Sequence, residues 1–487
     1  MAKLKQLFSI DVIRKIVLIY MLVQPIVDIT TSFLVRAGMD VTFGVILRAL
    51  FLAFMGCYAF FFYRGPKRKL VIAYLVAVIA FVAVQLVQLF AQGGMGVLFT
   101  NLKETIKVFY FPCVLVAFWA LYREFGYLVS NRSLVAIGVF YTLTIFISFV
   151  TDTSFQSYNG NGYCGWFYAA NEISSITLIL SPLVCYYFTN KTAYTGLLES
   201  PWAKRVSRIA LGAISVILML FAGTYLATKA ALLGIAVYLI CFLLWSVFRL
   251  EITRDKLHLF RMSAAILMIA ALVVLYLTSP VRQHLTERLP WFHYVQVQTG
   301  ATAPPATTTA PATTKPTTTP QTTIAARPTT NAKIYRIANW LLSSRLSNSR
   351  SVLFQYAESG MVQKLTGLGY TMQPSYRYNV AIAVEMDFIS VLYRHGIIGL
   401  LLFSAPFFSL LACALRRALK ALKGCLASLL WCTSLYQTMI AFAVGFLIGH
   451  TFVAPAVSIY AICSLLRLLA ETDRIYAEHK NALPPKK

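Results

Sequence analysis

Charged residues are scarce in this sequence, and acidic residues are the scarcest of them. Only 12% of the 487 residues are Asp, Glu, Lys or Arg, and just 17 are acidic. Water-soluble domains carry about 25% charged residues, so a soluble globular protein is excluded. Hydrophobic residues make up 59% of the chain, whose mean hydropathy is +0.70. Because a membrane-spanning helix needs about 20 apolar residues, this composition predicts a polytopic membrane protein.

Cysteines able to pair outside the membrane are also lacking. Most of the nine lie inside apolar runs, Cys425 lies in a basic loop, and only Cys164 lies in a loop that we place outside. One outer cysteine cannot form an intrachain disulfide. The first apolar run is not followed by a small-residue cleavage site, so we interpret it as a retained first span and not as a signal peptide.

Apolar runs of spanning length are what the chain does contain. They lie near residues 16–35, 44–63, 70–90, 106–122, 133–150, 172–189, 206–223, 226–248, 260–278, 388–413, 426–447 and 452–469. The predicted fold is therefore an all-α polytopic membrane protein with about 12 transmembrane helices.

The surplus of positive charge predicts the orientation of these helices. Lys and Arg number 43, which gives a formal net charge of +26. With both termini in the cytoplasm, 27 of these 43 residues fall in cytoplasmic loops and ends. Every second loop is then basic, as the positive-inside rule requires of an even-numbered bundle. We attribute the charge to topology in a lipid bilayer and predict no nucleic-acid partner.

One extracytoplasmic loop breaks this alternation and is much longer than the others. Its segment 299–331 has 14 Thr, 7 Ala and 6 Pro among 33 residues, which predicts a disordered or O-glycosylated tether. The segment after it contains KIYRIANWLL and SVLFQYAE, both with helical spacing, and TGLGYTM, which indicates a glycine turn. The chain thus divides into helices one to nine (1–278), the large loop with its short helices (279–384), helices ten to twelve (385–470) and a basic cytoplasmic tail (471–487).

The large loop carries ten Lys and Arg but only two acids, which topology does not explain. Arginine forks bind phosphate bidentately, and fixed cations stabilise a departing diphosphate. We interpret Arg345, Arg350 and Arg377, together with Lys229 at the start of span eight, as candidates for an outward-facing lipid diphosphate site. The alternatives are a basic loop lying on anionic lipid head groups and, for Lys229, snorkelling to the interface.

Glu385 and Asp387 stand at the membrane boundary where the tenth span begins. Two residues on a helix are separated by about 200°, so these carboxylates cannot both face one ligand. We predict that one acts as a catalytic base and the other as an anchor; the alternative is that both complement the dipole of a helix N-terminus. Their spacing would also suit a metal ion, but no histidine or further acid lies beside them. We predict no metal and no cofactor.

Further polar residues lie near the outer ends of the spans. The candidate contacts for a glycan or an acceptor are Asn171, Glu172, Tyr370 and His450. Asn171 and Glu172 open the sixth span and could instead brace a loop, while His450 in the last outer turn could have a packing role. Ionisable groups within spans are costly, and we expect Asp28 and Arg48 to offset that cost by pairing with each other.

With these residues in view, the chain resembles the O-antigen ligase family of bacterial membrane glycosyltransferases, which includes the related polysaccharide polymerases. The resemblance covers the whole chain in topology, with twelve spans and the large outer loop between spans nine and ten. Its local elements are ATKAALLG (227–234), SSRLSNSR (343–350), GLGY (367–370), VEMDFISVLYRHGIIG (384–399) and GHTFVAPAVSIY (449–460). The order and spacing of these elements carry the resemblance.

This resemblance implies transfer of a glycan from an undecaprenyl-diphosphate donor to the hydroxyl of a glycan or cell-envelope acceptor. The reaction would take place at the outer face of the bacterial cytoplasmic membrane, with inversion and without a metal. Carried over by position, Lys229 replaces an arginine, and Arg345 matches the arginine of the loop element. Glu385 stands eleven residues before Gly396, where ligases of Gram-negative bacteria usually have histidine. Lysine keeps the charge but loses the fork, and glutamate keeps a group that can act as a base.

A transporter is the alternative class, because a flippase for lipid-linked oligosaccharides would use similar cations. Such a flippase is expected to show paired half-chain repeats with charged residues in mid-membrane. Here the charges gather in one outer loop, and no internal repeat is visible. A third alternative is a protein that only anchors the Thr/Pro-rich segment at the cell surface, but such an anchor would not need twelve spans. The sequence therefore predicts an enzyme.

Overall fold

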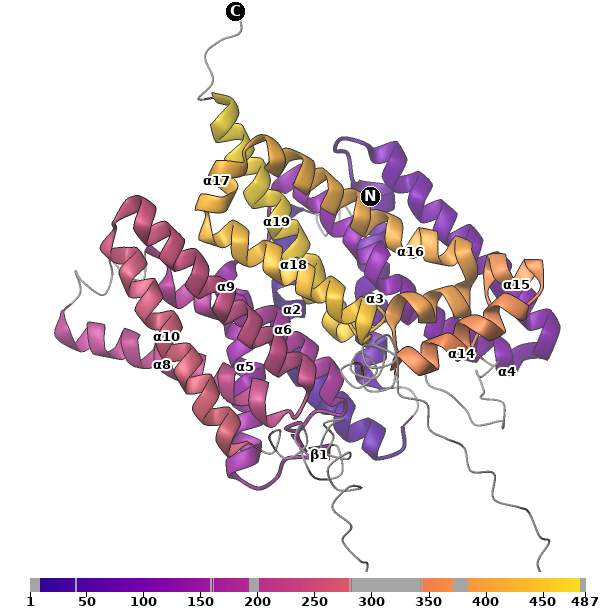
Figure 1. The fold of residues 1–487 in the computed structure, drawn as a ribbon. Coiled ribbons are helices and arrows are strands. Elements are labelled where there is room, and N and C mark those ends of the chain that lie inside the picture. The colour runs from indigo at the N-terminus through magenta and orange to yellow at the C-terminus, as the bar shows by residue number, and fades with distance from the viewer. Residues whose placement is uncertain are drawn as a thin grey trace, which may run out of the picture.

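The computed structural model shows a bundle of long helices (Figure 1). It describes residues 9–39, 42–157, 160, 162–191, 201–279, 282, 342, 345–370 and 384–481. Within these residues, 12 helical segments are long and apolar enough to cross a membrane. The predicted fold class, an all-α polytopic membrane protein, is confirmed.

Most of the helices follow one another along the chain with short connections. They are α2 (Ile10–Arg36), α3 (Phe43–Cys57) with the π-helical turn η1 (Tyr58–Phe62), α4 (Arg68–Phe125), α5 (Asn131–Val150), α6 (Ala170–Thr189), α8 (Trp202–Tyr225), α9 (Lys229–Thr253), α10 (Lys256–Thr278), α14 (Arg345–Glu358), α15 (Met361–Thr366), α16 (Asp387–Lys420), α17 (Leu422–Ala427), α18 (Leu429–Leu447) and α19 (Pro455–Asn481). The exceptions are the longer connections between α10 and α14 and between α15 and α16. Between α5 and α6 lies an antiparallel hairpin of β1 (Gln156–Ser157) and β2 (Gly162–Tyr163). Strands of two residues are too short for an alternating pattern, so the sequence did not predict them.

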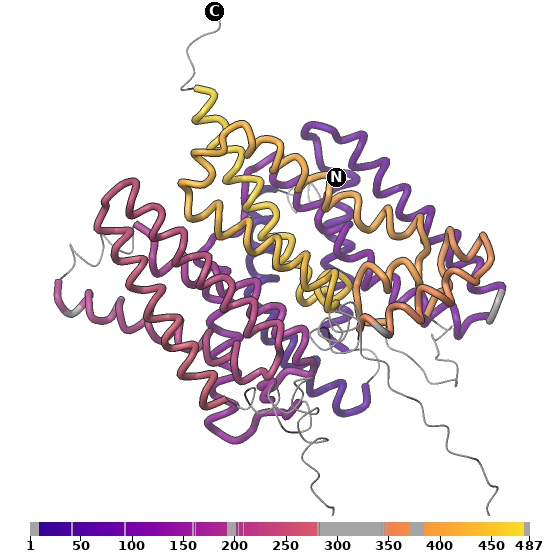
Figure 2. The backbone as a smooth tube through the Cα atoms, in the orientation of Figure 1, coloured from indigo at the N-terminus to yellow at the C-terminus, as the bar shows by residue number. Residues whose placement is uncertain are grey.

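Helix α4 contains two spans that meet at a sharp bend. Gly94 has a φ of 69°, a conformation that glycine adopts without a steric penalty. The two limbs, Arg68–Ala91 and Gly94–Phe125, are the third and fourth spans. Lys67, just before the first limb, and Arg123, near the end of the second, line the same groove, so the chain doubles back here (Figure 2).

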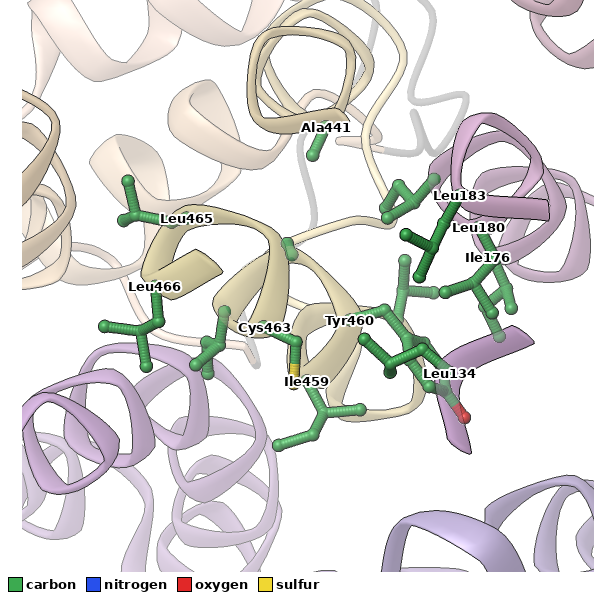
Figure 3. Packing of buried hydrophobic residues seen from close by; sticks show 14 of the residues in the cluster. Leu134, Ile176, Leu180, Leu183, Ala441, Ile459, Tyr460, Cys463, Leu465 and Leu466 are labelled. Carbon is green, nitrogen blue, oxygen red and sulfur yellow. The ribbon is translucent and has the colours of Figure 1, made fainter. Parts of the chain in front are cut away.

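The second limb of α4, helix α6 and the last helix, α19, form the centre of the bundle. In the apolar stretch of each span, 72%, 78% and 89% of the residues respectively are buried, compared with 22% in α10. In Figure 3, Tyr460 of α19 lies beside Leu134 of α5 and Ile176 of α6. Cys463, one turn further along α19, contacts Met21 of α2 at 3.8 Å. These three helices therefore form the interior, whereas peripheral helices such as α10 are mostly exposed at the surface of the bundle.

The eighth span begins later than predicted. We expected it from residue 226, but α9 starts at Lys229. Ala227 has a left-handed φ of 56°, which ends the preceding helix, and the hydroxyl of Thr228 caps the new one. The connection between the seventh and eighth spans is therefore a tight, ordered turn that places Lys229 at a helix N-terminus.

The last helix extends beyond its predicted end. We expected a basic tail at 471–487, but α19 continues to Asn481. Arg474 forms ion pairs with Glu471 and Glu478, one turn away on either side. Such pairs stabilise a helix surface, and apolar periodicity alone does not reveal them.

The large loop between α10 and α16 contributes two short helices to the described structure. The segment SVLFQYAE lies in α14, as its spacing predicted. Both α14 and α15 lie against α16, next to α4 (Figure 1). The Thr/Pro-rich segment 299–331 and all of KIYRIANWLL except Leu342 lie outside the described residues.

Candidate functional site

The carboxylate of Asp387 ties the start of α16 to the loop before α19. One of its oxygens accepts the backbone N–H of His450 at 2.7 Å. The other accepts the N–H groups of Thr451 and Phe452, at 3.0 and 2.7 Å. Three successive N–H groups reach one carboxylate because Gly449 and His450 have positive φ values, of 93° and 61°. Asp387 therefore fixes the His450 loop, residues 448–454, against α16.

Glu385 forms an ion pair with Arg345, the first residue of α14. The side chain of Arg345 is 11% exposed, whereas that of Glu385 is 32% exposed. A Cβ atom at Gly449 would lie only 1.6 Å from the main-chain oxygen of Glu385, so this backbone packs directly on the His450 loop. The pair thus presents an accessible carboxylate beside that loop, held by a mostly buried guanidinium.

The two carboxylates take different partners, but not because of a separation around a helix: α16 begins at Asp387, and Glu385 precedes it in non-helical backbone. Asp387 is fully buried, and backbone donors occupy both of its oxygens. Both carboxylates were candidates for catalysis in the sequence. We now interpret Asp387 as a positioning residue and keep Glu385 as the candidate base. Among the described residues, three or more His, Cys, Asp and Glu side chains nowhere gather in a way that could hold a metal ion.

The three arginines predicted to bind a diphosphate differ in their surroundings. Arg345 is mostly buried in its ion pair, whereas Arg350 is exposed on the same helix, α14. Five residues along a helix separate two side chains by about 140°, so these arginines do not share a face. Arg377 lies outside the described residues.

Helix α16 bends at Gly396, where φ is 67°, and the GLGY turn docks into the bend. The N–H of Leu368 donates to the carbonyl of Tyr393 at 3.0 Å, and the N–H of Gly369 donates to that of Arg394 at 3.1 Å. The guanidinium of Arg394 donates back to the carbonyl of Gly369 at 2.8 Å. The turn therefore satisfies carbonyl groups that the bend leaves without helical partners.

A chain of polar side chains fastens this turn to α4. Oε1 of Gln85 accepts a hydrogen bond from Nδ1 of His395 at 2.9 Å. Nε2 of His395 lies 3.3 Å from the hydroxyl of Tyr370, whose own N–H donates to Asn101 at 2.7 Å. Burial raises the pKa of Tyr370 above its usual range, so the hydroxyl stays protonated and can donate to His395. This geometry gives Tyr370, a predicted glycan contact, the role of holding the turn.

Asp28 and Arg48 form the ion pair that the sequence predicted. Their side chains are 9% and 12% exposed. The hydroxyl of Tyr141 donates to Asp28, and Oε1 of Gln24 accepts from Arg48 at 3.4 Å. Because a buried charge must be paired and hydrogen-bonded, we interpret this pair as structural.

Lys229, Asn171 and Glu172 lie where α6 and α9 begin. The hydroxyl of Thr228 hydrogen-bonds to that of Ser174 at 2.6 Å. This contact brings the N-terminus of α9 to the first turn of α6. Lys229, a predicted diphosphate contact, therefore starts its helix beside the two predicted glycan contacts, Asn171 and Glu172.

Lys107, on the second limb of α4, links the residues at the start of α6 to the His450 loop. It pairs with Glu104 at 2.7 Å and lies within electrostatic range of Glu172. One turn further along, the ring of Phe111 packs on that of Phe452 in the His450 loop, with centroids 4.6 Å apart. Residues four apart on a helix share a face, so Lys107 lies on the face of α4 that packs against this loop.

Sequence reasoning did not select Lys107, Gln85 or His395. Lys107 is a single cation near the end of a predicted span and carries no distinguishing motif. Gln85 and His395 are polar residues inside apolar runs, which is the signal that drew attention to Asp28 and Arg48. That signal marks a polar residue but does not tell which neighbour it meets across the bundle.

Comparison with known proteins agrees with this architecture. The family model described as O-antigen ligase like membrane protein matches residues 10–474, nearly the whole chain. A search of curated proteins finds no match. The match includes the His450 loop, the Glu385–Arg345 pair and all twelve spans except the last residues of α19. The chain therefore belongs to the family of O-antigen ligase like membrane proteins.

Proposed function

We propose that the protein is a glycosyltransferase of the bacterial cytoplasmic membrane. It moves a glycan from an undecaprenyl-diphosphate donor to an acceptor hydroxyl at the outer face, as a ligase or polymerase of surface polysaccharide. The observation that carries this proposal is the accessible carboxylate of Glu385, held by Arg345 beside the His450 loop. The family supports a membrane enzyme of glycosyltransferase type.

In the proposed reaction, Glu385 accepts the proton. The acceptor oxygen bonds to the anomeric carbon of the donor sugar while the bond from that carbon to the diphosphate oxygen breaks. The acceptor proton passes to the carboxylate of Glu385, and the electron pair leaves with the polyprenyl diphosphate. Attack from the face opposite the leaving group inverts the anomeric centre. A positioned general base contributes about 10²–10⁴-fold to such a reaction.

Cations stabilise the charge that develops on the departing diphosphate. Arg345 orients Glu385 through the ion pair and supplies one positive charge. Lys229 supplies another at the start of α9, where the helix dipole is also positive. Lys107, which pairs with Glu104, adds a third ammonium or guanidinium group from α4. We include Arg350 and Arg377 as contributors from the outer loop.

Glycan recognition is assigned to polar residues around this centre. Asn171 and Glu172 open α6, and the side chain of His450 is carried by the loop that Asp387 fixes. Their amide, carboxylate and imidazole groups offer hydrogen bonds to sugar hydroxyls. They are proposed to bind the donor glycan or the acceptor.

Turnover by the purified full-length protein tests this function. The protein in detergent is given a polyprenyl-diphosphate-linked oligosaccharide, alone and with a cell-envelope extract as acceptor, in the presence of EDTA. We expect release of polyprenyl diphosphate that persists in EDTA and falls at least about 10²-fold in Glu385→Gln. Glu358→Gln, which alters an exposed acid at the end of α14, is the matched control and should retain the wild-type rate.

The same preparation distinguishes the enzyme from a flippase. If the wild-type protein binds the donor without turnover and moves it across reconstituted vesicles, the glycosyltransferase proposal is wrong. The cations around Glu385 would then serve transport.

A further inference from the structure

A groove in the other half of the bundle has no part in the proposed reaction. It has a volume of about 330 Å³ and lies between the two limbs of α4, α16 and α19. Glu385 and His450 lie where α16 begins, whereas the groove follows the second half of α16, from Ala405 to Arg417. The groove is therefore separate from the Glu385 site.

The walls of this groove are apolar and open toward lipid. They include Leu70 and Val71 of the first limb of α4, Val116 and Trp119 of the second, and Leu410 of α16. Leu70 is 61% exposed, so the groove is open at the side of the bundle. An exposed apolar groove on a membrane-spanning surface is suited to a hydrocarbon chain.

One end of the groove is lined by three cations, Lys67, Arg123 and Arg417. Lys67 and Arg123 are exposed, and Lys67 has a left-handed φ of 62°, which L-residues adopt rarely. Arg417 is held by an ion pair with Asp473, whose carboxylate also accepts from the hydroxyl of Tyr122 at 2.8 Å. The described residues that line the groove thus include three cations and no acid, and Asp473 pairs with one of these cations, so the rim keeps a net positive charge.

We propose that this groove binds an anionic phospholipid of the bilayer. Its phosphate lies at Lys67, Arg123 and Arg417, and an acyl chain lies along the apolar walls. The combination of an apolar groove with a cationic end matches an amphipathic anion, whereas a zwitterionic lipid would leave the surplus charge uncompensated. The groove lies at the end of the bundle where the sequence predicts the cytoplasmic leaflet, and basic pockets between helices on that side bind anionic head groups.

Trp119 makes this proposal measurable because it lines the groove itself. Brominated acyl chains quench a tryptophan that they contact, and the difference between wild type and Trp119→Phe isolates this residue among the seven tryptophans. The full-length protein is reconstituted with brominated phosphatidylglycerol or brominated phosphatidylcholine at equal mole fraction. We expect stronger quenching of Trp119 by phosphatidylglycerol, and about fivefold weaker apparent affinity for each cation removed in Lys67→Gln and Arg123→Gln.

Arg416→Gln is the matched control, because Arg416 is exposed on α16 and does not line the groove. It should retain the preference for phosphatidylglycerol. Equal quenching by the two lipids, or a preference that survives the double variant Lys67→Gln/Arg123→Gln, would overturn the proposal. Displacement of the brominated lipid by polyprenyl phosphate at lower concentration than by unlabelled phosphatidylglycerol would also overturn it, because the groove would then bind the polyprenyl lipid.

Discussion

At the scale of single residues, Asp387 determines how the His450 loop is held. Its carboxylate accepts three N–H groups, whereas the amide of an asparagine would turn an NH₂ group toward a backbone donor. We expect Asp387→Asn to lower the free energy of unfolding by about 1–3 kcal/mol and to reduce turnover as the loop loosens. Thermal unfolding in detergent measures the first effect. Glu358→Gln should change stability by less than about 0.5 kcal/mol, and an equally small change for Asp387→Asn would contradict this role.

A substitution at Tyr370 distinguishes a structural role of this residue from a role in binding the glycan. Its hydroxyl faces His395 inside the docked GLGY turn, and its removal leaves Nε2 of that histidine without its donor. We expect Tyr370→Phe to cost about 1 kcal/mol of stability and to leave the KM for acceptor unchanged. A raised KM at wild-type stability would instead show that Tyr370 contacts the glycan, as the sequence analysis first proposed.

The residue scale also shows what a single sequence predicts well. The pairing of Asp28 with Arg48 followed from the cost of a lone charge in a span, because each was the obvious partner of the other. The pairing of Glu385 with Arg345 did not, because forty residues separate them and many cations of the outer loop were equally eligible. The motif around Glu385 made that residue a candidate, and its ion-pair partner could be identified only from the fold.

At the scale of elements, the bend in α16 decides where the GLGY turn docks. A Cβ atom at Gly396 would lie 2.4 Å from the carbonyl oxygen of Leu365, and the φ of 67° disfavours any side chain. We expect Gly396→Ala to destabilise the protein by about 2–4 kcal/mol and to reduce turnover, because α15 and the turn must move away from α16. Thermal unfolding and the polyprenyl diphosphate assay measure the two effects.

The matched control for this substitution lies in α3. A Cβ atom at Gly56 meets no other atom within 4 Å, and Gly56 lies within a helix. Gly56→Ala should leave stability unchanged or raise it by about 0.5–1 kcal/mol, since alanine is the better helix former. If the two variants have the same melting temperature, the bend at Gly396 is not what holds the turn.

Element boundaries show where apolar periodicity stops being informative. Twelve apolar runs were enough to locate the twelve spans, but the bends at Gly94 and Gly396 lie inside continuous helical patterns and were not predicted. The start of α9 depends on a left-handed residue and a threonine cap, and the end of α19 depends on ion pairs. Local backbone conformation and surface charge determine where these helices bend, begin and end, and both vary independently of hydrophobicity.

At the scale of the whole molecule, the Thr/Pro-rich segment 299–331 can be tested by deletion. Its composition offers little apolar surface for a core, and no step of the proposed reaction uses it. We expect deletion of 299–331, joined by a short Gly/Ser linker, to retain turnover within about threefold of wild type and to retain the melting temperature. A loss of turnover at normal stability would assign this segment a part in substrate binding.

The predicted orientation can be tested on intact cells. Cysteine is introduced at Glu358, in the outer loop, and at Glu251, at the cationic end of α9; both positions are exposed. A membrane-impermeant maleimide should label Glu358→Cys on intact cells and Glu251→Cys only after lysis, because basic loops stay in the cytoplasm. The opposite pattern would invert the topology and place the Glu385 site inside the cell.

The central claim is that Glu385 and Arg345 act as one unit in glycan transfer. The most direct test is a double-mutant cycle on the rate of polyprenyl diphosphate release, with Glu385→Gln, Arg345→Ala and both changes together. Residues that act as a unit are strongly non-additive, so we predict that the double variant loses about as much rate as the more impaired single variant. A wild-type rate in Glu385→Gln, or losses that multiply independently in the double variant, would contradict the claim.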